Sequence, residues 1–286
     1  MNKPLVSVVV PTYNRGQPLV RTLKSLLKQQ KVDFEILVVD QSKRRFAGKE
    51  KFLKEHPEIK YFKIFSPNAA RAKNFGAMKA RGEIILFVDD DIEARRGLIV
   101  NHVRNYVEAR VVGVAGRVVT PGEKEELGRV GVGRVWPWGY VSGGFSSNLR
   151  QEVAGVYGCN ASWRKEFFEK EGGFDERFVG NAIREETDLA LRMSQWGEII
   201  FDPKAEVVHK RAKSGGGRKD NRLKWYEDYF NNESVFMRKQ VRRYWWWLFW
   251  LIRWQYFVRC MLGWGREISW RSLVTPFRGI RRGMKR

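Results

Sequence analysis

Three consecutive aspartates, Asp89 to Asp91, directly follow an apolar segment, residues 84–88, in the motif EIILFVDDDI. A short, continuously apolar run bounded by polar residues is typical of a buried strand. Open α/β sheets bind their ligands at the carboxyl ends of such strands. Three adjacent carboxylates need a cation or strong hydrogen-bond donors nearby, and hard oxygen ligands suit Mg²⁺ or Mn²⁺. The motif therefore favours a divalent-metal site that serves a phosphorylated substrate; a solvated acidic turn is the alternative.

Chain length and cysteine content limit the class of protein. The 286 residues can bury the core of one large domain, alone or with an appendage. Cys159 and Cys260 are too few and too far apart for a disulfide framework or a zinc site, which favours a reducing compartment. Residues 5–10 are too short for the apolar region of a signal peptide. We therefore expect a cytoplasmic protein.

The last quarter of the chain differs in composition from the rest. The formal net charge is +22, and residues 211–286 contain nineteen Lys and Arg against five Asp and Glu. Eight of the twelve tryptophans lie in the same segment. Such an excess of positive charge indicates nucleic acid or an anionic membrane as a partner. We therefore expect one domain at residues 1–213 and a separate basic, aromatic region at residues 214–286.

Strand and helix patterns alternate over the first ninety residues. Strands are predicted at residues 5–10, 34–39, 61–65 and 84–88, and a helix at residues 68–80 leads into the last of them. This alternation indicates βαβ units, so the fold class is α/β with a mostly parallel sheet. Residues 121–157 are rich in glycine and lack periodicity, which predicts a long loop that covers the substrate.

Polar residues follow several of these strands and should meet at one edge of the sheet. They are Pro11, Tyr13, Asn14 and Arg15 after the first strand, Asp40 after the second, and Asp89 to Asp91 after the fourth. A tyrosine ring can stack on a base, and a carboxylate can accept a hydrogen bond from a base or a ribose. Arg71 and Lys73 lie early in a helix, where they can reach a diphosphate. The usual dinucleotide and P-loop fingerprints are absent.

Six motifs occur in an order and spacing that resemble family 2 glycosyltransferases of the GT-A fold. They are VSVVVPTYNR (residues 6–15), FEILVVDQS (34–42), the helix start at 68–76, EIILFVDDDI (83–92), GCNASWRKEFFEKEGGFDERF (158–178) and EETDLALRMSQWGEIIFDPKAEVVH (185–209). The resemblance covers roughly residues 4–240. It implies a GT-A catalytic domain at residues 1–213 and inverting transfer of a sugar from a nucleoside diphosphate donor, of UDP, GDP or dTDP type, to an acceptor hydroxyl.

The resemblance also implies roles for residues on the donor side. Asp91 is expected to bind Mn²⁺ or Mg²⁺, and His209, at the end of the FDPKAEVVH segment, to complete the metal site. Asp89 and Asp90 are expected near the donor ribose or sugar. Asp40 matches the position that reads the base in this family, with Pro11 and Tyr13 beside it. Arg15 and Arg71 are also expected to bind the nucleotide sugar, Arg71 at its diphosphate.

The general base is expected in the pair Glu185 and Glu186. Glu186 occupies the position where the family usually has an aspartate, so it is the first candidate and Glu185 the second. A carboxylate suits this role because it is ionised at neutral pH. The alternative is that both glutamates only stabilise a helix amino terminus. Asp188 and Arg192 form an i, i+4 pair that we expect to be structural.

The acceptor side is expected near the GGFDERF segment. Asp175 in this segment is predicted to contact a sugar. Trp163, Trp136 and Trp138 offer flat apolar rings that can stack on sugars or pack in the core.

Three interpretations of the basic region, predicted helical at residues 222–263, remain open. The longest uncharged run, residues 244–252, is too short to cross a bilayer. Tryptophan beside arginine is typical of a helix that lies in the interface of an anionic membrane. Packing on the catalytic domain or in a homo-oligomer is the second interpretation, and single-stranded nucleic acid the third, although no RNA-binding signature is present. On a helical wheel the basic residues cluster on one side: Arg238, Lys239, Arg242, Arg243 and Arg253.

The leading hypothesis is a metal-dependent, inverting glycosyltransferase at the cytoplasmic membrane face, acting on a lipid-linked or cell-surface glycan precursor. Two alternatives are a transferase of soluble glycans or proteins whose tail forms oligomers, and a non-catalytic module that binds membrane or nucleic acid.

Overall fold

The computed structural model describes residues 5–65, 67–180, 182–212, 215–216, 222–262 and 270–285. Within these residues nine strands form one mixed sheet in the order β3-β2-β1-β4-β8-β6-β9-β5, with β7 also paired to β9. The strands are β1 (Val6–Thr12), β2 (Phe34–Asp40), β3 (Ile59–Lys63), β4 (Ile84–Val88), β5 (Ile92–Ala94), β6 (Val111–Val119), β7 (Gln151–Glu152), β8 (Asn160–Arg164) and β9 (Glu198–His209).

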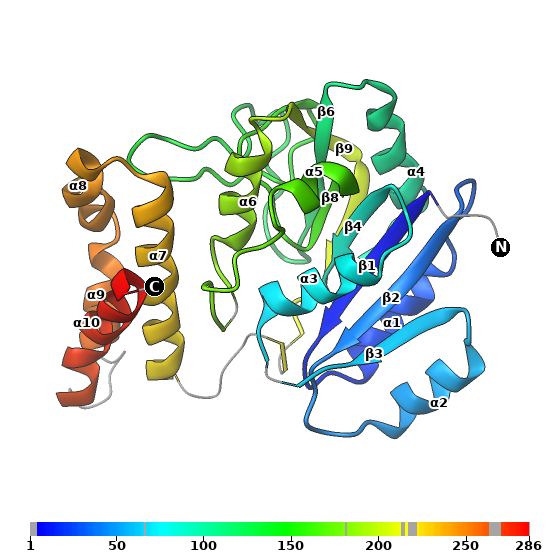
Figure 1. Cartoon of the computed structure of the whole chain (residues 1–286), viewed down its shortest axis with the longest axis horizontal. Helices are drawn as coiled ribbons and strands as arrows, with labels where there is room; N and C mark the ends of the chain where they lie inside the picture. The colour runs from blue at the N-terminus through cyan, green and yellow to red at the C-terminus, as the bar shows by residue number, and fades with distance from the viewer. Residues whose placement is uncertain are drawn as a thin grey trace.

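Helices cover both faces of this sheet (Figure 1). Those of the first two hundred residues are α1 (Gln17–Leu26), α2 (Ala47–Glu55), α3 (Ala69–Lys79), α4 (Leu98–Val103), α5 (Lys165–Lys170) and α6 (Glu185–Met193), with a 3₁₀ turn, η1 (Arg104–Val107), after α4. Strands β1 to β4 are parallel, and β4 pairs antiparallel with β8. The α/β fold class is confirmed.

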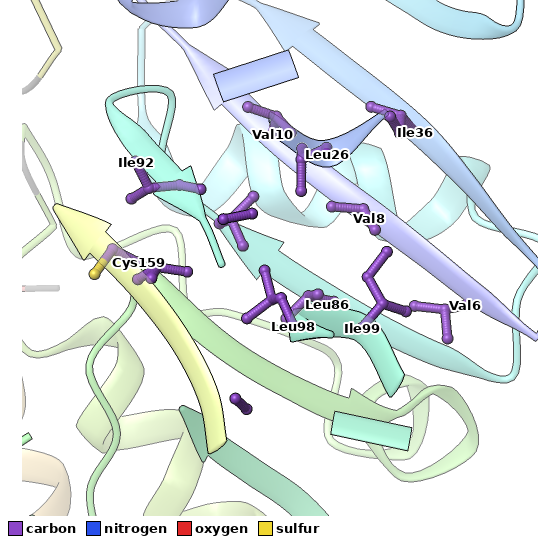
Figure 2. Close-up of a cluster of buried hydrophobic side chains, with 14 of the residues drawn as sticks. Val6, Val8, Val10, Leu26, Ile36, Leu86, Ile92, Leu98, Ile99 and Cys159 are labelled. Atoms are coloured by element: carbon purple, nitrogen blue, oxygen red, sulfur yellow. The ribbon is translucent and has the colours of Figure 1, made fainter. Parts of the chain in front are cut away.

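Successive residues of the central strands belong to different cores. Val6, Val8 and Val10 of β1 lie in one buried cluster with residues of α1 and α4, as Figure 2 shows, whereas Val9 packs in a second cluster with residues of α3 and α6. Burial on both faces explains the apolar runs at residues 8–10, 36–39 and 84–88 of β1, β2 and β4.

The predicted element bounds need small corrections. The third strand begins two residues earlier than predicted, at Ile59. The predicted helix at 68–80 is α3, and Asn68 caps it by accepting a hydrogen bond from the Arg71 N–H at 3.0 Å. Residues 121–157 form a long loop as predicted, with little regular structure besides the two residues of β7.

The basic region folds as several helices rather than one. They are α7 (Arg222–Gln240), a 3₁₀ turn η2 (Arg243–Trp245), α8 (Trp246–Leu251), α9 (Trp254–Met261) and α10 (Trp270–Lys285). The helical path breaks at Arg242, whose backbone is extended (ψ 143°). The predicted boundary between residues 213 and 214 and the predicted helix end at residue 263 lie outside the described residues. Among the described residues we find no helix that has both the length and the hydrophobicity to cross a membrane.

The helices of the basic region pack on the α/β region through α7. Glu233 of α7 forms buried ion pairs with Arg184, which precedes α6, at 3.0 Å and with Arg253 of the turn before α9 at 2.7 Å. Lys239 of α7 contacts Asp188 of α6 at 2.7 Å. Two of the five basic residues that the helical wheel placed on one side, Lys239 and Arg253, therefore point toward buried acids of the protein.

Candidate active site

The end of β4 and the end of β9 bring two carboxylates and an imidazole together. Strand β5 pairs antiparallel with β9 so that Ile92 lies opposite His209. The His209 Nε2 atom is 3.1 Å from Asp91 Oδ1 and 3.9 Å from Asp89 Oδ2. One ligand atom from each of these three residues lies within 4.8 Å of the others. The sequence analysis assigned Asp91 and His209 to a metal and placed Asp89 near the donor ribose or sugar, whereas the structure groups Asp89 with the other two. The two carboxylate oxygens of the cluster suit Mn²⁺ or Mg²⁺.

The environment of Asp91 keeps this carboxylate ionised. Burial opposes ionisation, but the hydrogen bond with His209 and the charge of Arg15 lower the pKa of Asp91 to about 2. Arg15 Nη1 lies 2.8 Å from Asp91 Oδ2, and the Ala212 N–H donates to the same oxygen at 2.8 Å. The His209 Nδ1 atom is buried without a hydrogen-bond partner among the described residues, so Nε2, 3.1 Å from Asp91 Oδ1, is the ring nitrogen that faces the cluster. The cluster therefore fits a cation that would take its ligand atoms from Asp89, Asp91 and His209.

Asp90 points in a different direction from its two neighbours. It accepts a hydrogen bond from Thr12 Oγ1 at 2.5 Å and forms an ion pair with Arg15. Burial raises the pKa of Asp90 to about 7, although Arg15 opposes this shift. Asp90 thus links the end of β1 to the end of β4, and it holds Arg15 beside the metal-ligand cluster.

A cavity of about 300 Å³ opens over this edge of the sheet. Volumes of this order and above are typical of small-molecule sites. Nine of the predicted site residues line it: Pro11, Tyr13, Arg15, Asp89, Asp90, Asp91, Glu185, Glu186 and His209.

Glu185 and Glu186 begin α6 and line the same cavity, and both interact with Lys73 of α3. The Lys73 Nζ atom lies 2.5 Å from Glu185 Oε1 and 3.5 Å from Glu186 Oε1. Burial raises the pKa of Glu185, and the charge of Lys73 opposes this shift. The side chain of Glu185 is 1% exposed, whereas that of Glu186 is 22% exposed and reaches the cavity. Of the two, Glu186 is in the better position to meet a substrate.

Gly158 leaves the space that the side chain of Glu186 occupies, and a glutamate is one methylene longer than an aspartate. A Cβ atom at this position would lie 2.0 Å from Glu186 Oε1 and 2.6 Å from its Cδ. Only glycine therefore permits Glu186 to occupy its observed position. The sequence did not single out this glycine, because the contact joins residues far apart in the chain.

Two residues predicted to bind the donor lie away from the cavity. Asp40 is completely buried, accepts hydrogen bonds from the Ser42 N–H and Tyr61 Oη, and pairs with Lys49, so its oxygens already have partners. The residue that follows it, Gln41, lines the cavity instead. Arg71 also does not line the cavity, and its guanidinium lies 2.8 Å from Glu176.

The predicted acceptor residues are likewise engaged elsewhere. Trp163 is completely buried in β8, where its ring occupies the space that the missing side chain of Gly113 leaves, so it cannot stack on a sugar. Asp175 pairs with Arg177 at 2.6 Å and with Lys239 at 2.7 Å, outside the cavity lining. Asp188 is paired with Arg192 at 3.1 Å, as expected for a structural contact.

Trp225 lines the cavity although the sequence placed it in the separate basic region. It lies in the first turn of α7 and stacks on Tyr229, with ring centroids 5.5 Å apart and planes 12° apart. No local pattern distinguishes this tryptophan from the other seven of the segment, since its position depends on how α7 docks.

Comparisons with known proteins agree with this geometry. The family model described as "Glycosyl transferase family 2" matches residues 7–172. A GalNAc(5)-diNAcBac-PP-undecaprenol beta-1,3-glucosyltransferase of Campylobacter jejuni is 34% identical over 100 residues, which are 34% of this chain and 32% of that protein. For the first four curated relatives, the match spans only 13% to 34% of their own length.

Solved structures share the fold. A crystal structure of GalNAc-T7 with UDP, GalNAc and Mn²⁺ aligns with a TM-score of 0.64 and 17% identity over 84% of this chain and 51% of that chain. The mannosyltransferase PcManGT from Pyrobaculum calidifontis, in complex with GDP-Man and Mn²⁺, aligns with a TM-score of 0.55 and 17% identity over 99% of this chain and 70% of that chain. The GT-A fold predicted from the sequence is thus confirmed.

Proposed function

Because this chain belongs to glycosyl transferase family 2, we propose that it is a metal-dependent, inverting glycosyltransferase that uses a nucleoside diphosphate sugar. The observation that most supports this activity is one cavity lined both by the cluster of Asp89, Asp91 and His209 and by Glu186. The cluster suits a diphosphate with its cation, and Glu186 suits a hydroxyl that must lose a proton.

Different residues of the cavity would bind the metal, stabilise the leaving group and accept the proton of the acceptor. Asp89, Asp91 and His209 would hold Mn²⁺ or Mg²⁺, which when bound stabilises the charge that develops on the diphosphate leaving group. Arg15 adds a fixed positive charge beside it. Glu186 takes the proton of the acceptor hydroxyl, whose oxygen bonds to the anomeric carbon as the bond to the diphosphate breaks. Attack from the face opposite the leaving group inverts that carbon.

Pro11, Tyr13 and Gln41 are positioned to contact the nucleoside, since they line the same cavity at the ends of β1 and β2. The neighbours with UDP or GDP-Man show that this fold accepts either base type, so UDP, GDP and dTDP sugars are the donors to screen.

The acceptor that we propose is a lipid-linked or cell-surface glycan precursor, as in polysaccharide biosynthesis. The name of the Campylobacter jejuni relative specifies a polyprenol-linked glycan as its acceptor. Peripheral attachment at the cytoplasmic membrane face would suit such a substrate, and the basic region has the charge for it.

Calorimetry with UDP, GDP and dTDP sugars, with and without Mn²⁺, tests the proposal. We expect one donor class to bind only with the cation, and Asp91→Asn to abolish that binding. Glu198→Gln is a matched control, because this acid lies at the far end of β9 from His209. Absence of binding by every donor, or equal binding by Asp91→Asn and the unmodified protein, would reject the proposed activity.

A further inference from the structure

Large apolar side chains are exposed on the helices that follow α7 and on the residues between them. They are 36% to 76% exposed, and the set comprises Tyr244, Trp247, Leu251, Trp254, Leu262, Trp270, Leu273 and Phe277. Three of the four exposed tryptophans of the described chain are among them, and the fourth, Trp196, lies near the end of α6. Such a concentration on one part of a surface is typical of an interaction site.

The packing of α10 determines which of its sides faces outward. Gly279 and Gly283 lie directly against α7, since a Cβ atom at either position would meet the Glu227 or Asn231 carbonyl oxygen within 2.5 Å. The opposite side exposes Trp270, Leu273 and Phe277, which follow an i, i+3, i+7 spacing and so form one row. The small residues that seat α10 on α7 therefore also fix this apolar row toward solvent.

A row of basic side chains lies beside the apolar row on α10. Arg271, Arg278, Arg281 and Lys285 are all exposed, and on a helical wheel they occupy the arc next to Trp270 and Phe277. Arg242, Arg243 and Arg259 are exposed on the preceding segment. No acidic residue occurs at positions 234–262 or 270–285. Of the three acids of α7, Asp228 and Glu233 are buried, and the partly exposed Glu227 pairs with Arg282 at 3.5 Å, so none of them is paired with the exposed basic row.

We propose that this outer surface of α8, α9 and α10 binds the interface of an anionic lipid bilayer. Aromatic rings prefer the headgroup region, and arginine prefers lipid phosphate, so an apolar row beside a basic row matches the layers of a membrane surface. A second copy of the chain fits less well, because a symmetric contact would place these arginines against each other.

The same helices connect to the cavity through α7. In Figure 1, α7 stands between the sheet and helices α8 to α10. Trp225 of α7 lines the cavity, and Tyr229, on which it stacks, also stacks on Tyr256 of α9 with ring centroids 4.4 Å apart. Membrane binding by α8 to α10 would thus hold the cavity near the bilayer. This last step rests on the proposed function; the binding itself does not.

Flotation of the full-length protein with phosphatidylcholine vesicles, with and without phosphatidylglycerol, tests the surface. We expect binding that requires phosphatidylglycerol and weakens as salt rises. The double variants Trp270→Ser/Phe277→Ser and Arg278→Gln/Arg281→Gln should each bind roughly tenfold or more weakly. Phe65→Ser and Arg96→Gln change exposed residues of the α/β region and should bind as the unmodified protein does.

Thermal unfolding and donor calorimetry on the same variants distinguish loss of membrane binding from loss of folding and from an incorrect assignment of the activity. Unchanged melting and unchanged donor binding, with lost flotation, would support the surface whether or not the activity is correct. Equal flotation of all variants would reject it. The proposal would also be rejected if the protein did not bind vesicles and these residues instead mediated self-association in sedimentation or bound single-stranded oligonucleotides.

Discussion

Lys73 and Glu185 form a buried ion pair across the active-site wall, with 2.5 Å between Nζ and Oε1. The pair joins α3 to the first residue of α6, and Glu186 follows immediately with its own oxygen 3.5 Å from the same Nζ. The surrounding carboxylates raise the pKa of Lys73, although burial alone would lower it. The amine is therefore charged, and it holds two neighbouring carboxylates that would otherwise repel each other.

Replacement of Lys73 by methionine should destabilise the protein. Glu185 would keep its buried position without a counter-charge, and loss of one partner of such a pair costs about 3–5 kcal/mol. In the double variant Lys73→Met/Glu185→Gln no buried charge is left alone, so most of the stability should return. Urea unfolding of the single and double variants measures this difference. Equal unfolding midpoints would contradict a coupled pair.

Replacement of Gly158 by alanine should displace Glu186 and reduce kcat. The new methyl group would overlap Oε1, and a shift of about 1 Å in a catalytic group can cost ~100-fold in rate. Donor affinity should stay unchanged, because Gly158 does not line the cavity. Gly143→Ala is the control, since nothing lies within 4 Å of a Cβ there.

A second substitution distinguishes displacement from unfolding in this experiment. Glu186→Asp shortens the acid by one methylene and withdraws it from the new methyl group. Gly158→Ala/Glu186→Asp should therefore be more active than Gly158→Ala alone. If the double variant is the less active of the two, Glu186 is not the group that Gly158 accommodates for catalysis.

The parallel strands β1 to β4 and the position of the aspartates after β4 were predictable because they depend on local rules. Unbroken apolar runs identify strands that are buried on both faces, and residues after parallel strands share one edge. Asp89 and Asp91 follow β4 directly, and β9 delivers His209 to the same edge. The place of His209 was expected from the family resemblance, since β9 was not among the strands predicted from the residues alone.

The site residues that lie elsewhere than predicted have a common physical cause. Each contacts side chains from distant segments of the chain. Asp40 is at a strand end as predicted, but Lys49 of α2 and Tyr61 of β3 occupy its oxygens. Trp163 is buried because Gly113 on β6 leaves space for its ring. Trp225 reaches the cavity because α7 docks on α6. None of these contacts follows from the residues beside it in the chain.

The buried triad Arg184–Glu233–Arg253 should stabilise the attachment of the basic region. Both carboxylate oxygens of Glu233 have an arginine, at 3.0 and 2.7 Å, and the two positive charges lower its pKa although burial opposes this. Glu233→Gln should cost about 3–5 kcal/mol in the free energy of unfolding. Glu227→Gln on the same helix removes partly exposed ion pairs and should cost at most about 1 kcal/mol. Urea unfolding compares the two, and similar losses would argue against the triad as the anchor.

His102 should make stability fall as the solution becomes acidic. Its ring is completely buried between Ser162 at 2.9 Å and Asn160 at 2.8 Å, and burial lowers its pKa from 6.5 to about 4. Between these two pKa values the unfolded chain binds a proton that the folded chain does not, so stability decreases as pH falls through this window. His102→Gln cannot take up this proton. It should be less stable than the unmodified protein at about pH 7, but its free energy of unfolding should change less between about pH 7 and about pH 4. Urea unfolding across that range gives both slopes, and identical slopes would show that His102 does not titrate on unfolding.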